Sequence, residues 1–326
     1  MSNPLHASFY ADAAVQQRVR VVENVRLARD TYRVRFECPE IARRIIPGQF
    51  IMMRLADCDD PLLGRPLALY DTVLADDTVL ADDTGLADDT GLADDTVPAD
   101  DTVLADDTGL AGDQQPVGLD IVYLILGKMT TRLATLPPGG ELEVWGPLGN
   151  GFMPQHTEHL VMVAGGIGQT PFMALARQYL GQRHYGDTPP NVASADRVTL
   201  CYGARSADYL AGVEDFESLG VQLRLSTDDG TRGHKGLVTD LLSDELKTAG
   251  QNTHVVCCGP EPMMEAVSQI TRAAGLPCQV SLETPMACGI GICFSCVAKV
   301  CDDEGGWDYK RTCVDGPVFA AERIVW

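Results

Sequence analysis

The chain has 326 residues, of which 45% are hydrophobic, and it carries a formal net charge of −21. This length is enough for two or three domains. No window approaches the roughly 18 unbroken apolar residues of a membrane-spanning helix, so we expect no membrane association. The negative charge argues against nucleic acid as a partner. Residues 1–17 lack the basic start and apolar core of a secretory signal, and many cysteines are scattered along the chain, so we expect a cytoplasmic protein.

The first third of the chain predicts an antiparallel β-barrel. Short β-rich runs at residues 19–25, 31–37 and 49–55 are separated by turn residues. Two further strands are expected at residues 65–70 and 120–126. A long acidic segment separates these last two strands, and we place it at the tip of the hairpin between them.

This acidic segment, residues 71–113, holds fourteen aspartates and neither lysine nor arginine, so it contributes two thirds of the net charge. Six copies of Ala-Asp-Asp-Thr-x-x run from Ala75 to Leu110. Dense like charge with few apolar residues cannot bury enough surface to offset chain entropy, which predicts a disordered or loosely looped insertion. The alternative is a two-coil left-handed β-helix, which would stack aspartates at about 4.8 Å.

The middle third predicts an α/β nucleotide-binding domain. A buried strand at residues 160–164 leads into the turn Gly165-Gly166-Ile167-Gly168-Gln169-Thr170-Pro171 and a helix at 172–179, which Thr170 is expected to cap. A second strand, 253–258, runs into Gly259-Pro260, and a third, 198–202, precedes Arg205-Ser206. Such strand-to-helix turns expose backbone N–H groups to dinucleotide phosphates.

Three histidines near these elements have no predicted role. His156 and His159 form an H-x2-H pair after Pro154 in an expected linker, so we interpret them as solvated side chains rather than ligands. His234 is interpreted as a turn residue.

The C-terminal region carries the most specific pattern, in which Cys288, Cys293, Cys296 and Cys313 give the spacing C-x4-C-x2-C-x16-C. Four thiolates so spaced suit a 2Fe–2S cluster, because each of its two irons needs two protein ligands. The glycines between the first two cysteines allow the backbone to bend around the cluster. A zinc site or disulfides are the alternatives, and the glycine-rich C-x4-C arm favours neither.

A dinucleotide site and a one-electron cluster require an intermediary. Nicotinamide exchanges a hydride, whereas the cluster carries single electrons, and a flavin converts between the two. The barrel remains as the domain to hold that flavin, with Arg65 facing a flavin phosphate and Gly127-Lys128-Met129-Thr130 after the next strand.

Outside the repeat, residues 19–326 resemble the iron–sulfur electron-transfer subunit of NAD-dependent dihydroorotate dehydrogenase (class 1B), in the ferredoxin reductase superfamily. The resemblance rests on motifs along the whole chain, namely Arg65-Pro66-Leu67-Ala68 (the family's Arg-Pro-x-Ser), Gly146-Pro147-Leu148-Gly149-Asn150-Gly151-Phe152, Gly165 to Pro171, Cys258-Gly259-Pro260, Glu283-Thr284-Pro285-Met286-Ala287-Cys288 and Cys313-Val314-Asp315-Gly316-Pro317-Val318-Phe319. Two residues depart from the pattern. Ala68 replaces a serine, and Met129 replaces the second glycine of Gly-x-Gly-Thr, where it is expected to crowd the backbone near the flavin phosphates.

The resemblance implies a multidomain protein with an antiparallel β-barrel FAD domain (residues 1–154, with the insertion 71–113), an α/β NAD-binding domain (155–279) and a small 2Fe–2S domain (280–326). It implies that the four cysteines ligate the cluster and that Cys258 contacts the nicotinamide, a buried core thiol being the alternative. The other implied cofactor-binding residues are Arg65, Pro66, Leu67, Ala68, Val122, Tyr123, Leu124, Met129, Thr130, Gly165, Gly166, Gly168, Gly259 and Pro260.

The resemblance also implies the function. An FMN-containing catalytic subunit would oxidise dihydroorotate for pyrimidine (UMP) biosynthesis, and this chain would pass the electrons through 2Fe–2S and FAD to NAD in a heterotetramer of two plus two subunits. The alternative within oxidoreductases is a reductase subunit serving ferredoxin or sulfide, whose relatives often have Asp as the first cluster ligand, whereas this chain has Cys288. The alternative of another class is an acidic-repeat scaffold or binding protein. NADP also stays open, because Arg205-Ser206 suits a 2′-phosphate.

Overall fold

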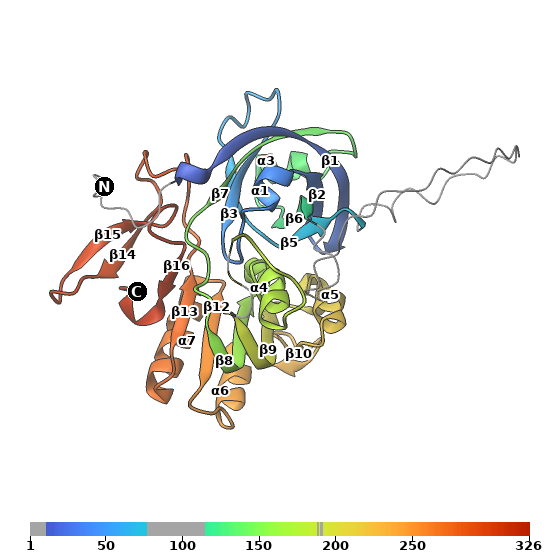
Figure 1. Cartoon of the computed structure of the whole chain (residues 1–326). Coiled ribbons are helices and arrows are strands. Elements are labelled where there is room, and N and C mark those ends of the chain that lie inside the picture. Colours follow the sequence, from blue (N-terminus) through green and yellow to red (C-terminus); the bar gives the residue numbers. More distant parts are fainter. Residues whose placement is uncertain (1–10, 77–114, 188, 190–191) are drawn as a thin grey trace, which may run out of the picture.

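The structure is a computed structural model that describes residues 11–76, 115–187, 189 and 192–326. The chain forms three parts (Figure 1): a barrel from the first third, an α/β layer below it, and a C-terminal part with a projecting hairpin. The predicted multidomain fold is confirmed. Among the described helices, none is long and apolar enough to cross a membrane.

The barrel is a single antiparallel sheet with the strand order β4-β3-β7-β1-β2-β6-β5. Alternate residues of its strands fill the interior, such as Val34 and Phe36 or Ile121 and Tyr123, as a sheet with one buried face requires. Its elements are η1 (Ala11–Ala13), β1 (Val15–Ala28), β2 (Thr31–Glu37), α1 (Pro39–Ala42), β3 (Phe50–Leu55), β4 (Arg65–Ala68), β5 (Asp71–Leu74), β6 (Pro116–Leu124), α3 (Lys128–Leu133) and β7 (Glu141–Leu148).

The low-complexity insertion begins later in the chain than predicted. Asp71–Leu74 form strand β5, which pairs antiparallel with β6, so that Asp71 lies opposite Asp120 and Leu74 opposite Pro116. These four residues are part of the barrel wall and not of the low-complexity insertion. The copies of the repeat lie almost entirely outside the described residues. Both interpretations of the repeat, as a disordered loop and as a β-helix, therefore concern residues that the structure does not describe.

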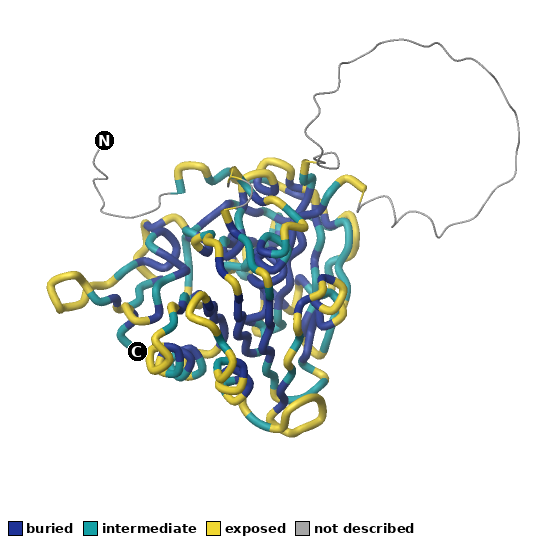
Figure 2. Tube along the Cα trace, turned by 60° about the horizontal axis from the view of Figure 1, so that its bottom comes forward, coloured by how far each residue is buried: buried dark blue, intermediate teal, exposed yellow. Residues whose placement is uncertain are grey.

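The nucleotide domain is a mostly parallel sheet with the order β11-β10-β9-β8-β12-β13-β16, in which only β16 is antiparallel to its neighbour. Leu160 and Met162 of β8 pack toward α4 and α5, whereas Val161 and Val163 pack toward α6 and α7. Buried residues therefore run through the middle of this domain (Figure 2). Its elements are β8 (His156–Gly165), η2 (Gly166–Gln169), α4 (Phe172–Tyr179), β9 (Ser194–Ala204), η3 (Ala207–Tyr209), α5 (Val213–Ser218), β10 (Gln222–Thr227), β11 (His234–Lys235), α6 (Val238–Leu246), β12 (Thr253–Cys258), α7 (Glu261–Ala274), β13 (Cys278–Ser281) and β16 (Val318–Ala320).

Three local predictions in this domain are wrong. The N-cap of α4 is Pro171, and Thr170 has helical backbone angles at the end of η2, so Thr170 does not cap the helix. His159 is not solvated, because β8 already begins at His156 and buries the His159 ring beside Thr199 Oγ1, 2.9 Å from its Nε2. Burial, with Arg197 nearby, lowers the pKa of His159 to about 4. His156 is exposed as expected. The prediction that His234 is a turn residue is also wrong, because His234 lies in the short strand β11.

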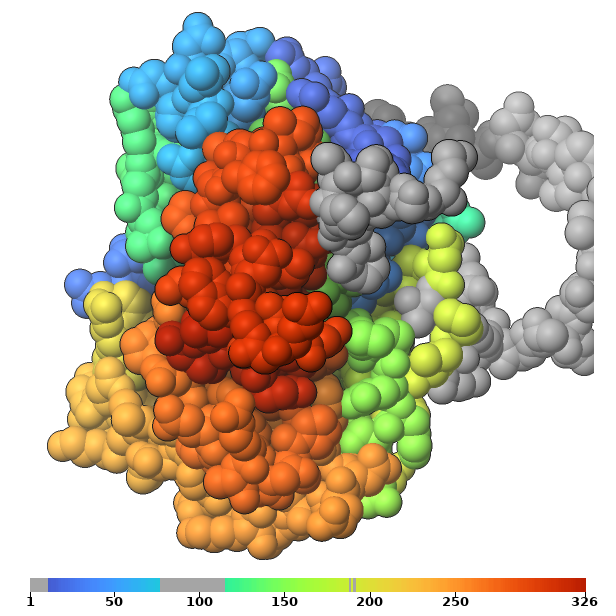
Figure 3. Space-filling model, turned by 90° about the vertical axis from the view of Figure 1, so that its left-hand side faces the viewer, coloured from blue at the N-terminus to red at the C-terminus, as the bar shows by residue number. Residues whose placement is uncertain are grey.

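The C-terminal part is attached to both other domains. Its hairpin consists of β14 (Val297–Cys301) and β15 (Trp307–Arg311), followed by β16 and η4 (Ala321–Arg323). Because β16 pairs with β13, residues 318–320 of the predicted cluster domain belong to the sheet of the nucleotide domain. Figure 3 shows this part, in red, over the junction between the barrel and the nucleotide domain.

Replacing residues 77–114 with a Gly-Asn turn should preserve flavin content, iron content and NADH oxidation. The pairing of Leu74 with Pro116 already brings the two ends together, and loop-closure entropy changes by only roughly 0.6 kcal/mol per doubling of loop length. The isoelectric point should rise, because twelve aspartates are removed. A matched variant whose deletion begins at Asp71 should lose barrel stability. Loss of FAD from the first variant, measured by its absorbance, would contradict the hairpin assignment.

Candidate functional site

The first pair of candidate cluster ligands, Cys296 and Cys313, is buried beneath the β14–β15 hairpin. The ladder of that hairpin pairs Val297 with Arg311, and the Thr312 N–H donates to the Cys296 carbonyl at 2.8 Å. Residues that flank the two cysteines are thus held together by strand pairing, and the two Sγ atoms lie 3.1 Å apart. Pairing within the hairpin therefore holds two candidate sulfur ligands close together.

The second pair, Cys288 and Cys293, lies in the loop before β14 and is more exposed. The Ser295 hydroxyl, 3.1 Å from Cys293 Sγ, lowers the pKa of that thiol to about 6, with a smaller contribution from the Cys288 thiol. Within the described chain, no three His, Cys, Asp or Glu side chains are grouped to hold one metal ion. Two pairs of thiols fit a two-iron cluster, since each iron takes two protein sulfurs.

Glycines shape the loop between these cysteines, as the sequence predicted. Gly289 and Gly291 have φ of 74° and 82°, values that residues other than glycine rarely adopt. A Cβ atom on Gly289 would come within 2.5 Å of Met52 in the barrel, so the loop can approach β3 only without a side chain there. Arg311 fixes the other end by donating to the Gly291 carbonyl at 2.8 Å.

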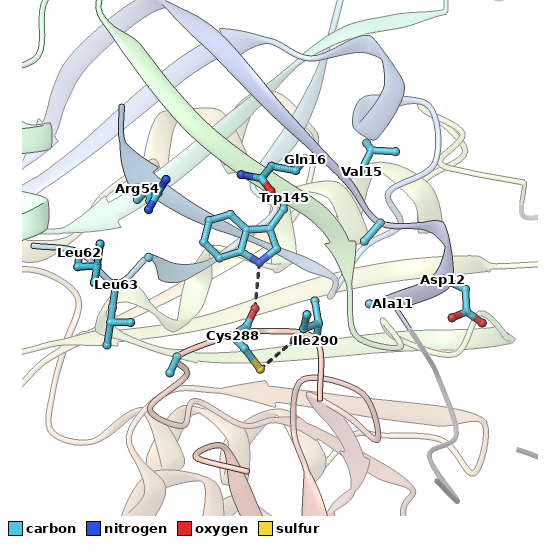
Figure 4. Close-up of a pocket in the computed structure, with 13 residues that line it drawn as sticks. Ala11, Asp12, Val15, Gln16, Arg54, Leu62, Leu63, Trp145, Cys288 and Ile290 are labelled. Atoms are coloured by element: carbon cyan, nitrogen blue, oxygen red, sulfur yellow. Dashed lines mark hydrogen bonds between the residues drawn. The ribbon is translucent and has the colours of Figure 1, made fainter. Parts of the chain in front are cut away.

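One hydrogen bond joins this loop to the barrel. Trp145 on β7 donates its indole N–H to the Cys288 carbonyl at 2.9 Å, as Figure 4 shows. The indole lies in a pocket of about 690 Å³, whose wall includes Arg54, Leu63 and Ile290. The first candidate ligand is therefore positioned by a barrel side chain, which sequence reasoning did not identify.

The predicted glycine turns meet at one edge of the nucleotide sheet. A Cβ atom on Gly168 would come within 2.2 Å of the Cys258 carbonyl, and one on Gly165 within 2.8 Å of Pro260. The turn after β8 therefore packs directly on the turn after β12. This edge is where parallel α/β sheets bind nucleotides.

A carboxylate that the sequence analysis left without a role joins this edge. β13 runs parallel to β12, with Ser281 opposite Cys258, so Glu283 follows the strand end directly beside that thiol. Burial raises the pKa of Cys258, and the charge of Glu283 raises it further. The pKa of Glu283 is raised too, because the surrounding protein desolvates its carboxyl group even though part of the residue is exposed. The sequence does not show that β13 lies next to β12, and this pairing is the signal that places Glu283 beside Cys258.

The candidate flavin residues divide into two sets. Arg65, Pro66, Leu67 and Ala68 lie on edge strand β4, where Arg65 is exposed and donates to the Leu63 and Gly64 carbonyls. Val122 packs at the contact with the nucleotide domain, and Leu124 is half-buried. Thr130 accepts hydrogen bonds from the Leu126 and Gly127 N–H groups at the start of α3.

Tyr123 and Met129 form the second set, because their side chains lie inside the barrel core. The Tyr123 hydroxyl donates to Asn24 there. Only their backbones are available to a cofactor. Met129 therefore does not crowd the phosphate region as expected, since its side chain points into the core.

Two sequence models of protein families match the chain. The iron-sulfur cluster binding domain of dihydroorotate dehydrogenase B matches residues 283–325, and the oxidoreductase NAD-binding domain matches residues 162–269. The electron transfer subunit of dihydroorotate dehydrogenase B (NAD(+)) from Caldanaerobacter subterraneus is 31% identical over 95% of this chain and 99% of its own length. The chain belongs to this family of electron transfer subunits. The Desulforamulus reducens subunit is also 31% identical, over 92% of this chain and 94% of its own.

Solved structures agree with the fold. A chain from the structure of an NADH-dependent reduced ferredoxin–NADP oxidoreductase has a TM-score of 0.69 and 26% identity, covering 94% of this chain and 90% of its own. Phthalate dioxygenase reductase has a TM-score of 0.54 at 15% identity, covering 92% and 96%, and shows the fold alone.

Family membership confirms that the chain is an oxidoreductase subunit in NAD-dependent dihydroorotate oxidation, with a 2Fe–2S cluster, FAD and NAD as cofactors. The name of the relatives implies a catalytic partner subunit. Matches over nearly the full length of these relatives favour this family over the ferredoxin or sulfide reductase and over the scaffold.

Replacing Cys293 with Ser should remove the visible iron–sulfur absorbance and the iron, while NADH still reduces the flavin. Cys293 belongs neither to the candidate flavin strand β4 nor to the glycine turns of the nucleotide domain, so loss of this ligand should act locally. Cys301→Ser is the matched control, because Cys301 lies in the same hairpin but outside the two pairs. Unchanged iron content in Cys293→Ser would contradict the ligand assignment.

Proposed function

We propose that this chain takes single electrons from an FMN-containing subunit that oxidises dihydroorotate and delivers them to NAD, as a step of pyrimidine biosynthesis. The observation that best supports this is the position of the cluster loop, residues 288–296. This loop contacts the barrel through Trp145 and exposes the apolar side chains of Ile292 and Phe294. When bound, FAD exchanges a hydride for single electrons, and the cluster carries electrons singly.

The residues of this chain would bind and orient these groups. Cys288, Cys293, Cys296 and Cys313 would hold the cluster. The exposed Arg65 guanidinium on β4 would pair with a flavin phosphate, a charge-assisted contact. The remaining candidates, Pro66, Leu67, Ala68, Val122, Leu124 and Thr130 with the backbones of Tyr123 and Met129, would line the flavin, and Gly165, Gly166, Gly168, Gly259 and Pro260 the dinucleotide.

The chemistry assigned to this chain needs no general acid or base for dihydroorotate, because the partner carries out that oxidation. The raised pKa of Cys258 keeps its thiol protonated at neutral pH, so Cys258 is suited to packing against a nicotinamide ring and not to nucleophilic attack. Glu283 stands beside it at the same edge and would help to orient the ring.

NAD is the expected nucleotide. The relatives are named for NAD(+), and the backbone N–H groups of Asp228 and Asp229 bond to Ala204 and Arg205, which places two acidic residues next to Arg205. Acidic residues at such a strand end favour a ribose hydroxyl over a 2′-phosphate. A cytoplasmic location is supported by the seven cysteines outside the two candidate ligand pairs, because none of them is in a disulfide.

The partner subunit would dock over the cluster loop, in a heterotetramer of two plus two subunits as the family resemblance suggests. Ile292 and Phe294 beside the cysteines are 73% and 63% exposed, and Leu62 and Leu63 across the Trp145 pocket are 58% and 53% exposed. Figure 4 shows both leucines facing the indole from the loop before β4. Ile290 lines the same pocket as the two leucines, and we call Leu62, Leu63 and Ile290 the apolar patch. Such a cluster of exposed apolar side chains is typical of a protein interface.

The double variant Leu62→Asp, Leu63→Asp should weaken binding of the catalytic subunit at least tenfold. Burying a leucine is worth about 1.5–3 kcal/mol and 1.4 kcal/mol is tenfold in affinity, and an aspartate in its place must be desolvated. The measurement is titration of the purified catalytic subunit, followed by electron transfer from dihydroorotate to NAD.

Leu237→Asp is the control for this experiment. Leu237 is 62% exposed but lies before α6 in the nucleotide domain. Its substitution should leave partner binding unchanged. Equal binding by both variants would remove the apolar patch from the proposal, and a chain that accepts no electrons from the catalytic subunit at all would contradict the proposed function.

Arg65→Ala should weaken FAD binding roughly tenfold or more, because a hydrogen bond to a charged group contributes about 1.5–3 kcal/mol. Iron content should not change. Arg20→Ala, an exposed arginine on β1 of the same barrel, is the matched control. FAD titration of the apoprotein by fluorescence measures the effect, and an affinity equal to that of the control would show that the flavin motif is misplaced.

A further inference from the structure

A buried carboxylate of the barrel is bonded to the nucleotide domain. Asp71, the first residue of β5, is only 6% exposed. Its Oδ2 lies 2.8 Å from Arg177 Nε, and its Oδ1 lies 3.3 Å from Arg183 Nη1 and accepts a hydrogen bond from the Tyr185 hydroxyl at 2.6 Å. Arg177 belongs to α4, and the other two residues follow that helix. Three side chains of one domain therefore converge on one carboxylate of another.

The preceding residue makes a second connection. The Tyr70 hydroxyl donates to Asp215 of α5 at 2.7 Å. The Tyr70 carbonyl accepts the Ala174 N–H at 3.0 Å, which is one of the N–H groups in the first turn of α4 that have no partner within the helix. Two adjacent residues thus hold the nucleotide domain through both side chains and one backbone group.

These contacts lie between the two candidate cofactor motifs. Ala68, at the end of β4, precedes Tyr70 by two residues, so the strand that carries Arg65 leads directly into the contact. On the other side, α4 begins at Phe172, immediately after the glycine turn that ends at Pro171. Figure 1 shows β5 in the part of the barrel that lies above α4 and α5, and β5 contacts α4. A shift at Tyr70 or Asp71 would move one motif relative to the other.

We infer that Tyr70 and Asp71 form an interdomain clasp with Arg177, Arg183, Tyr185 and Asp215, which sets the distance between the flavin and the nicotinamide. This inference rests on the proposed function, since it concerns hydride transfer between those two groups. None of the six residues is among the candidate cofactor-binding residues, so we assign them a positioning role. Hydride transfer requires reacting atoms roughly 3–3.5 Å apart, and a misplacement of about 1 Å can cost roughly 100-fold in rate.

The barrel supplies a matched control in Asp120, the residue opposite Asp71 in the β5–β6 ladder. Asp120 is 5% exposed, and Arg35 binds both of its carboxylate oxygens at 2.8 Å. Arg35 belongs to β2, so this ion pair lies wholly within the barrel. Asp120→Asn removes a carboxylate of equal burial without affecting the interdomain contact.

The test compares Asp71→Asn with Asp120→Asn in the full chain. Stopped-flow measurement of flavin reduction by NADH gives the limiting rate and the NADH concentration for half-saturation. In Asp71→Asn the limiting rate should fall roughly 10- to 100-fold. Half-saturation should change little, because the dinucleotide turns lie within one domain. The long-wavelength charge-transfer absorbance of reduced flavin with NAD should weaken, while FAD content, iron content and reduction by dithionite stay normal.

Asp120→Asn should keep a limiting rate within about twofold of the parent even if its melting temperature falls, which separates positioning from stability. If Asp71→Asn does not accumulate as folded protein, the double variant Tyr70→Phe, Tyr185→Phe is measured instead. It leaves both ion pairs of Asp71 in place and should show the same selective loss of limiting rate.

A normal limiting rate with a normal charge-transfer band in whichever clasp variant is measured overturns the inference, as does an equal loss in Asp120→Asn. Failure of the parent chain to be reduced by NADH contradicts the proposed function instead. The two failures are therefore distinguishable in one set of measurements.

Discussion

The constraint on which this structure depends is that one barrel must hold two other domains at fixed positions. Electron and hydride transfer both require short, defined distances, and separate domains move relative to each other unless their contacts are specific. Two polar contacts of the barrel show how this requirement is met. Trp145 holds the cluster loop through the Cys288 carbonyl, and Asp71 holds the nucleotide domain through two arginines. The candidate flavin strand β4 ends at Ala68, three residues before Asp71.

The two contacts use different chemical groups. The Trp145 hydrogen bond uses a backbone carbonyl, so the identity of the first cluster ligand is independent of it. The Asp71 contact uses charged groups taken out of water, and such groups are costly unless every partner is in place. A buried carboxylate with two arginines therefore tolerates few alternative arrangements of the two domains. Such a contact is better suited to fixing the distance between the two cofactors than to stabilising the fold.

Most of the fold could be predicted from local patterns. Strands at 31–37 and 253–258 and the helix at 172–179 coincide with β2, β12 and α4, because hydrophobic periodicity and the flanking turns agree there. The cysteine spacing predicted four ligands, and the structure places them as two pairs, Cys296 with Cys313 and Cys288 with Cys293. His159 was misassigned because its burial depends on Thr199 and Arg197 of a neighbouring strand. Likewise, Glu283, Trp145 and Asp71 acquire their roles only from partners far along the chain, which local sequence does not reveal.

The pairing of β16 with β13 affects how the protein can be assembled and divided. The cluster loop and its hairpin lie between two neighbouring strands of one sheet, so in connectivity they form an insertion within the nucleotide domain. That sheet gains its edge strand only from residues 318–320, after the whole cysteine region has been synthesised. Folding during translation therefore cannot complete the nucleotide domain first and add the cluster segment later. Recombination between related genes at residue 280 would also cut through this sheet, and an exchange that carries both strands would preserve it.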